Sequence, residues 1–147
     1  MLLKGEIMNI NKELLIFKRK YPLTIAFRLF KHSEIIKKHL KPDENVLFVF
    51  CGQKNVSSFH IINTCVMALT NKRIMIGQKR VLWGYFFTSI TPDMYNDIKV
   101  KKNLIWSDLE IDTIKENIYL SNLDPDAAIE IESIITDYMI KEKKKYD

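Results

Sequence analysis

Residues 59–80 constrain the fold of this chain more than any other segment. A β-branched apolar run meets a polar corner at residues 70–73, and a second apolar run, residues 74–76, leaves that corner. β-Branched residues favour strands, and an asparagine among polar neighbours suits a tight turn. We therefore expect a strand, a turn and a returning strand, which together begin an antiparallel sheet.

Similar short runs continue to residue 120 and indicate a meander of strands. The expected strands comprise residues 46–50, 59–69, 73–77, 81–90, 98–100, 104–111 and 117–121. Aromatic residues in the fourth run favour a strand over a helix. Short runs spaced by about ten residues predict a sandwich or a small barrel of about seven antiparallel strands.

The last segment has a well-marked helix start. Asp124 is an N-cap residue that precedes Pro125 at the first helical position, and the lysines from Lys141 to Lys145 suit the negative end of a helix. One face is apolar and comprises Ala128, Ile131, Ile135, Tyr138 and Met139, widened by Ile134. This face should bury against the sheet. The expected fold class is α+β, mainly β, with the barrel capped by this helix.

The N-terminal segment is expected to be helical over residues 12–40, with a break near Pro22. Pro22 suits the first turn of a second helix, since its missing N–H costs nothing there. Residues 1–42 carry a net charge of +7, whereas residues 43–147 carry −2. Attraction to anionic partners is therefore expected in this segment.

Basic residues interleaved with aromatic ones form the candidate contact surface. The candidate contacts for an anion, a lipid or a partner are Lys18, Arg19, Lys20, Arg28, Lys31, Lys72 and Arg73. Such a mixture suits a bilayer interface, where rings insert and cations meet anionic headgroups. Alternatively, the apolar helix faces pack on the barrel or on a second subunit, and Arg73 pairs with a nearby acid. Nucleic acid is a weaker partner because no recognised binding motif accompanies the patch.

The length and composition of the chain restrict the class of protein. A chain of 147 residues and 17.4 kDa with 47% apolar and 28% charged residues is expected to form one globular domain. Cys51 and Cys65 lie in apolar runs and are expected to be small buried residues in a reducing compartment, although a disulfide would need only that their strands be neighbours. The N-terminus is too charged for a signal peptide, and no run has the length of a membrane span. The expected location is the cytoplasm, with peripheral membrane contact as an addition.

The chain carries no recognisable catalytic or metal-binding pattern. His32 and His39 are seven residues apart, whereas paired zinc ligands on a helix need three or four, and His60 stands alone on an expected strand. Asp108 and Glu110 share a strand face, which we interpret as a solvated sheet face and not as an acid–base pair. We therefore expect no enzyme activity, no metal and no cofactor.

Several of these segments together resemble the bacterial pleckstrin-homology (PH-like) domain family. Residues 40–44 precede an apolar strand, a long strand ends in Thr-Asn-Lys-Arg at residues 70–73, and a strand at 105–111 is followed by the turn 112–116 and a single terminal helix. The resemblance covers residues 34–142 and implies a PH-like fold without catalytic residues. We therefore divide the chain into a basic helical extension, residues 1–33, and a PH-like domain, residues 34–147. The eukaryotic phosphoinositide pattern is not met, since only Lys54 is basic between the first two strands.

These observations leave three functional hypotheses. The leading one is a non-catalytic binding or scaffold module that associates with a partner protein or with further copies of itself. The second is a peripheral membrane protein that docks on anionic lipid through residues 12–41. The third is a small enzyme or ligand carrier that uses the barrel interior, which would need a sizeable pocket with converging polar groups.

Overall fold

The computed structural model describes residues 9–54 and 63–145. The elements are α1 (Ile10–Lys20), α2 (Leu29–His39), β1 (Val46–Gln53), β2 (Thr64–Thr70), β3 (Ile74–Lys79), β4 (Tyr85–Ile90), η2 (Pro92–Met94), β5 (Tyr95–Lys102), β6 (Ser107–Thr113), β7 (Asn117–Leu123) and α3 (Pro125–Lys144). Residues 59–62 of the second expected strand, with His60, lie outside the described residues. The remaining expected strands are present with shifted ends.

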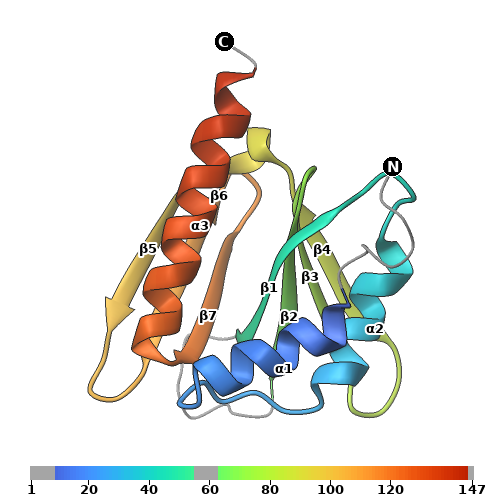
Figure 1. The fold of residues 1–147 in the computed structure, drawn as a ribbon, viewed down its shortest axis with the longest axis vertical. Helices are drawn as coiled ribbons and strands as arrows, with labels where there is room; N and C mark the ends of the chain where they lie inside the picture. The colour runs from blue at the N-terminus through green and yellow to red at the C-terminus, as the bar shows by residue number, and fades with distance from the viewer. Residues whose placement is uncertain (1–8, 55–62, 146–147) are drawn as a thin grey trace.

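The strands form one antiparallel sheet in the order β4-β3-β2-β1-β7-β6-β5. The sheet consists of two blocks, β1 to β4 and β5 to β7, which are joined where Gln53 of β1 pairs with Ser121 of β7. Figure 1 shows the two blocks diverging from this corner, with α3 in front of one block and α1 in front of the other. This is the PH-like arrangement that the sequence predicts.

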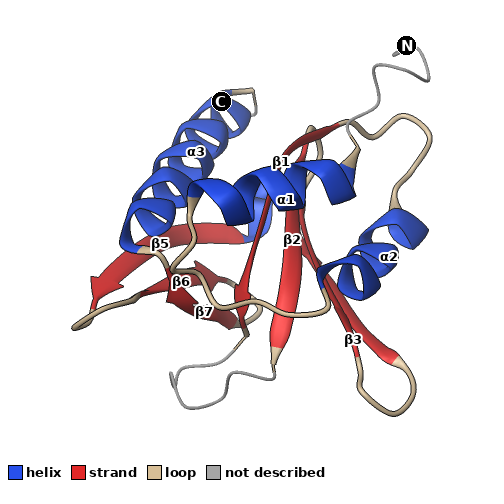
Figure 2. Cartoon of the chain, turned by 60° about the horizontal axis from the view of Figure 1, so that its bottom comes forward, coloured by secondary structure: helices blue, strands red, loops and turns tan. Residues whose placement is uncertain are grey.

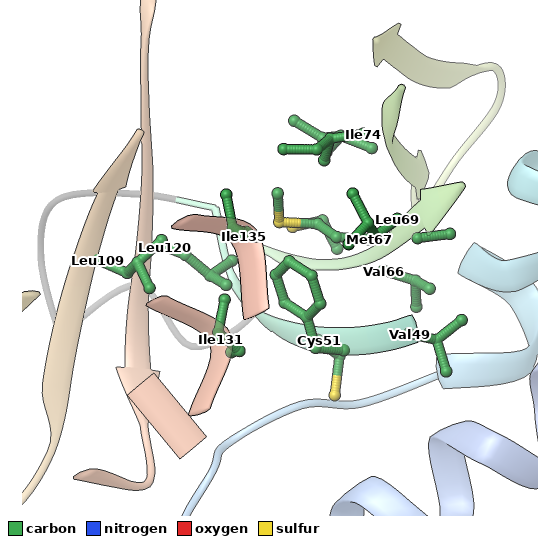
Figure 3. Packing of buried hydrophobic residues seen from close by; sticks show 14 of the residues in the cluster. Val49, Cys51, Val66, Met67, Leu69, Ile74, Leu109, Leu120, Ile131 and Ile135 are labelled. Carbon is green, nitrogen blue, oxygen red and sulfur yellow. The ribbon is translucent and has the colours of Figure 1, made fainter. Parts of the chain in front are cut away.

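The sheet differs from the expected barrel because it does not close. β4 and β5 end the strand order at opposite sides and do not pair with each other. The space between the blocks is filled instead by the apolar side of α3. Figure 3 shows Ile131 and Ile135 between Leu109 and Leu120 on one side and the strands of the other block on the other. Because a helix supplies this packing, the two edge strands remain apart.

Helix α3 begins and packs as its sequence predicts. The Asp124 carboxylate accepts a hydrogen bond from the Asp126 N–H at 3.0 Å, and Pro125 occupies the first turn. The apolar face is buried, with Ile131 and Ile135 fully inaccessible to solvent. The expected N-cap and the expected buried face are both confirmed.

Helices α1 and α2 are part of the core. Leu14 and Phe17 of α1 are buried in the same apolar cluster as β1, and Ile36 of α2 is buried in it with the β3 residues. Gly77 of β3 lets α2 approach closely, since a Cβ atom at this position would lie 3.0 Å from the Ile35 Cβ. The apolar faces of both helices therefore cover the sheet, and the 33/34 division drawn from the sequence falls inside α2.

The expectation that Pro22 begins the second helix is wrong. Residues 21–28 form an irregular connection, and α2 starts only at Leu29. Tertiary hydrogen bonds hold this connection: the Ile25 N–H donates to the Asn122 carbonyl at 2.9 Å, and the Phe27 N–H donates to the Thr64 hydroxyl at 3.0 Å. These bonds with distant strands outweigh the local preference of proline for a helix start.

Two apolar runs that predict strands form turns instead. Residues 81–84 connect β3 to β4, with a hydrogen bond of 3.1 Å from the Arg80 N–H to the carbonyl of Gly84, whose φ is 80°. Residues 103–106 connect β5 to β6 in the same way, with a 2.9 Å bond from the Asn103 N–H to the Trp106 carbonyl. The fourth and sixth strands therefore begin later than expected, and their first apolar residues are exposed.

Both cysteines are buried core residues, as the sequence predicts. Cys51 of β1 and Cys65 of β2 lie on neighbouring strands and are free thiols. Burial raises the pKa of each thiol to about 12. Both groups are therefore neutral at physiological pH and behave as small apolar side chains.

Candidate functional site

A buried ion pair joins the start of β1 to the corner between β2 and β3. The Arg73 Nε donates to Glu44 Oε2 at 2.9 Å, and its Nη2 donates to Glu44 Oε1 at 3.0 Å and to the His39 carbonyl at 2.9 Å. The Thr70 hydroxyl donates to Glu44 Oε2 at 2.6 Å. The Glu44 side chain has no exposed surface. This pair therefore fixes the corner and is the acid-paired arrangement of Arg73 that the sequence left as an alternative.

The protonation of Glu44 is set by two opposing effects. Burial raises the pKa of its carboxyl, but the hydrogen bonds from Arg73 and Thr70 outweigh burial, so the net pKa lies below the ordinary value. A carboxyl whose pKa is lower in the folded state stabilises the fold above its unfolded pKa. This contribution is lost as the pH falls through the folded-state pKa.

The same corner carries two further contacts between residues 43–45 and 71–72. The Lys72 ammonium donates to the Asp43 carboxylate at 2.5 Å at the surface. The Asn45 N–H donates to the Asn71 side chain at 2.7 Å, and the Asn71 N–H donates back to the Asn45 carbonyl at 3.0 Å. We call residues 43–45 together with residues 70–73 the corner clasp. The corner clasp joins parts of two sequence segments that carry the family resemblance, residues 40–44 and 70–73. Its two cations, Lys72 and Arg73, are already paired with carboxylates of the same chain.

The basic end of α1 does not form one charged site. The Lys18 ammonium donates to the Thr24 carbonyl, and Arg19 is exposed to solvent. The Lys20 ammonium pairs with the Glu130 carboxylate at 2.8 Å, which the Tyr21 hydroxyl also contacts. This cluster ties the end of α1 to α3, and nothing in the sequence pattern indicated it.

Arg28 and Lys31 are exposed near the start of α2, at an end of the molecule where three connections lie. We call this surface the loop end and define it as residues 21–28, 79–85 and 101–106. Figure 1 shows the three connections at the bottom of the fold, and Figures 1 and 2 place the β5–β6 turn and the β3–β4 turn on opposite sides of it. The exposed apolar side chains in the three connections are Leu23, Phe27, Val81, Leu82, Trp83, Tyr85, Leu104 and Ile105.

A groove of about 430 Å³ lies on β5, β6 and β7. Lys99 and Lys101 of β5 line it opposite Glu110 and Asp108 of β6, and Tyr119 of β7 closes it. Asp108 and Glu110 therefore share one sheet face, as the sequence predicts. The Asn103 side chain donates to the Asp108 carboxylate at 2.9 Å, and the Asn117 side chain donates to Glu110 at 3.1 Å. Each amide contacts one oxygen of its carboxylate, and Asp108 Oδ1 is buried without a hydrogen-bond partner among the described residues.

The sequence model of the family described as "Bacterial PH domain" matches residues 40–137. The chain belongs to the bacterial PH domain family. The match begins just before the corner clasp and extends into α3, so it includes all seven strands. Both α1 and α2 precede the matched residues, although both helices pack on the sheet of this bacterial PH domain.

Two solved structures from Shewanella are similar to this chain. A DUF1696 family protein with a pleckstrin-homology domain from Shewanella loihica PV-4 is 12% identical, with a TM-score of 0.47, and the alignment covers 78% of this chain and 99% of that one. A pleckstrin homology domain from Shewanella amazonensis SB2B is 13% identical, with a TM-score of 0.49 and coverage of 76% and 88%. Comparison with curated proteins gives no match.

Proposed function

We propose that this bacterial PH domain is a non-catalytic binding module that pairs with a second copy of itself through the free edge of β4. Support for a non-catalytic role comes from the interior, where Phe50, Met67 and Leu120 fill the space that a ligand would need. Among residues 9–54 and 63–145, no cluster of three or more His, Cys, Asp or Glu side chains could hold a metal. Binding therefore falls to the outer surface.

The observation that carries the pairing is the difference between the two sheet edges. Edge strands normally carry charges, prolines or bulges that prevent pairing with another chain. β5 has charged residues along its length and an irregular register between Tyr95 and Asp97. β4 has the sequence YFFTSI, with no charge, no proline and an unbroken register with β3. β4 therefore lacks the features that protect β5.

The two faces of β4 are already covered by the chain itself, so its backbone edge is the part left for a partner. His39 of α2 stacks on Phe87 with a ring-centroid distance of 3.8 Å. On the opposite face, the Lys54 ammonium lies 3.2 Å from the centre of the Phe86 ring. Two copies related by a twofold axis can pair their β4 strands antiparallel, because such a contact uses the same edge twice.

A lysine in the middle of β4 is expected to abolish this pairing. In Thr88→Lys, each copy carries a charge at the edge, and two like charges on facing strands repel. Light scattering after size exclusion should give twice 17.4 kDa for the native chain and 17.4 kDa for the variant. Asn96→Lys places the same charge on β5 and should leave the mass doubled. A native chain of monomer mass, or a Thr88→Lys chain of doubled mass with a native circular dichroism spectrum, contradicts the proposal.

A further inference from the structure

The groove on β5, β6 and β7 lies on the face of these strands that points away from α3. Ile98 and Ile111, which alternate with its charged residues, pair across β5 and β6 and are buried in the core cluster that includes α3. Figure 1 shows α3 on that covered side of the three strands. The groove has a volume of about 430 Å³, which is within the range of small-molecule sites. Its size therefore suits a small ligand.

The groove carries both signs of charge on neighbouring strands. Lys99 is paired in register with Glu110, and Lys101 is paired with Asp108. Opposite charges at such positions attract each other. Nevertheless, none of the ion pairs within residues 9–54 and 63–145 includes Lys99 or Lys101. The cations along β5 and the carboxylates along β6 therefore form two separate walls of the groove.

The two carboxylates are held in place and keep capacity for a further donor. The Asn103 amide holds Asp108 through Oδ2, and the Asn117 amide holds Glu110 through Oε1. Asp108 Oδ1 is buried and has no hydrogen-bond partner in the part of the chain that the structure describes. A carboxylate oxygen that is shielded from water and lacks a donor is unfavourable. A ligand that brings an N–H donor to this oxygen therefore gains more than it would at an exposed carboxylate.

An aromatic side chain completes the groove on its third strand. Tyr119 of β7 is paired in register with Glu110 of β6 and is 37% exposed. An aromatic ring offers apolar contact area, and its face attracts a cation. Across the three strands, the groove thus presents cations first, then carboxylates and then an aromatic ring.

We infer that this groove binds an α-amino acid with a large apolar side chain. The ligand carboxylate contacts Lys99 and Lys101, its ammonium group donates to Asp108 and Glu110, and its side chain packs on Tyr119. The two charged groups of an amino acid flank one carbon atom, so the molecule can bridge neighbouring strands, which lie about 4.8 Å apart. A simple anion is repelled by the carboxylates and a simple cation by the lysines. A quaternary ammonium group has no N–H for the unpaired Asp108 oxygen.

This surface differs from the basic segment that the sequence alone suggests for binding. The apolar faces of α1 and α2 are buried against the sheet, with Leu14 and Ile36 inaccessible to solvent. No helix within the described residues has the length and apolar character to span a bilayer. Three of the basic candidates, Lys20, Lys72 and Arg73, are paired with carboxylates of the chain. The groove also lies far from β4 in the strand order, so ligand binding stands or falls independently of the self-pairing.

The test is isothermal titration calorimetry of the full chain with L-phenylalanine and two analogues. Phenethylamine lacks the carboxylate, and hydrocinnamate lacks the ammonium group. L-Phenylalanine should bind saturably, and each analogue should bind at least about tenfold more weakly, because each leaves one charged wall of the groove without its partner. An analogue that binds as tightly as L-phenylalanine overturns the proposal. Absence of saturable L-phenylalanine binding at millimolar concentrations also overturns it.

Substitutions on the two walls locate the charged contacts. Asp108→Asn and Lys101→Gln should each raise the Kd for L-phenylalanine by about tenfold or more, since each removes one charge-assisted contact. The matched controls are Asp112→Asn and Lys102→Gln, on the same strands but outside the groove lining, which should leave the Kd unchanged. A Kd that Asp108→Asn and Lys101→Gln leave unchanged, in chains with a native circular dichroism spectrum, contradicts the inference.

Nuclear magnetic resonance supplies a readout that needs no substitution. When L-phenylalanine is added to the isotope-labelled native chain, the amide shifts should concentrate in residues 99–101, 108–110 and 119. The mass measured by light scattering should not change on saturation, because the ligand does not touch the β4 edge. Shifts that concentrate on β4 or in residues 21–28 instead overturn the proposed site.

Discussion

Replacing Glu44 with alanine is expected to lower the free energy of unfolding by about 3–5 kcal/mol. The substitution removes the only carboxylate that contacts the Arg73 guanidinium within the described residues and leaves this cation mostly buried, with 17% of its side chain exposed. The Thr70 hydroxyl loses the same acceptor. Urea denaturation followed by circular dichroism measures the change.

Asp43→Ala is the matched control, because Asp43 makes the exposed ion pair of the same corner clasp. Exposed pairs contribute little, so its cost should stay under about 1 kcal/mol. Replacing both members of the buried pair, Glu44→Met with Arg73→Met, should cost less than Glu44→Ala alone, because no charge is then left unpaired. Equal costs for Glu44→Ala and Asp43→Ala would show that the clasp does not hold the fold.

Leu14→Ala is expected to lower the free energy of unfolding by about 2–5 kcal/mol, the range for a fully buried leucine. Leu14 lies on the face of α1 that packs on the core and has 0% exposure, whereas its neighbour Leu15 is 44% exposed. Leu15→Ala should therefore change the free energy by about 0.5 kcal/mol or less. Urea denaturation of the two variants compares them directly. A similarly small loss of unfolding free energy in Leu14→Ala and Leu15→Ala would mean that α1 is not part of the core.

The elements that sequence predicts best are those in which local signals and packing agree. The helix that starts at Asp124 has a cap, a proline and one apolar face, and all three act in the structure. The corner at residues 70–73 turns the chain as its polar residues indicate, with the Thr70 N–H donating to the Arg73 carbonyl at 2.9 Å. In both places a short segment specifies its own conformation.

The elements that sequence predicts poorly depend on distant residues. Residues 81–83 and 104–105 are apolar and read as strand starts, yet they are exposed turns. Hydrophobic pattern alone cannot distinguish the buried start of a strand from an exposed apolar turn. The helix start expected at Pro22 is wrong for a related reason. Hydrogen bonds from residues 21–28 to Asn122 and Thr64, which are distant in the sequence, fix the conformation of this connection.

The candidate site could be predicted only in part. The seven basic candidates were identified by charge, but charge does not reveal which cations find acids in the fold. Lys72 and Arg73 are paired within the corner clasp, and Lys20 is paired with Glu130 on α3, far away in the sequence. Among the candidates on the loop end, Arg28 is joined by Arg80, Lys101 and Lys102, which sequence reasoning did not single out.

Hydrogen–deuterium exchange of the full chain tests most directly whether the N-terminal helices belong to the core of the fold. The amides of α1 and α2 should exchange as slowly as those of β1 and β2, because the apolar faces of both helices are buried against the sheet. Fast exchange throughout α1 and α2, beside slow exchange in β1 and β2, would contradict the account.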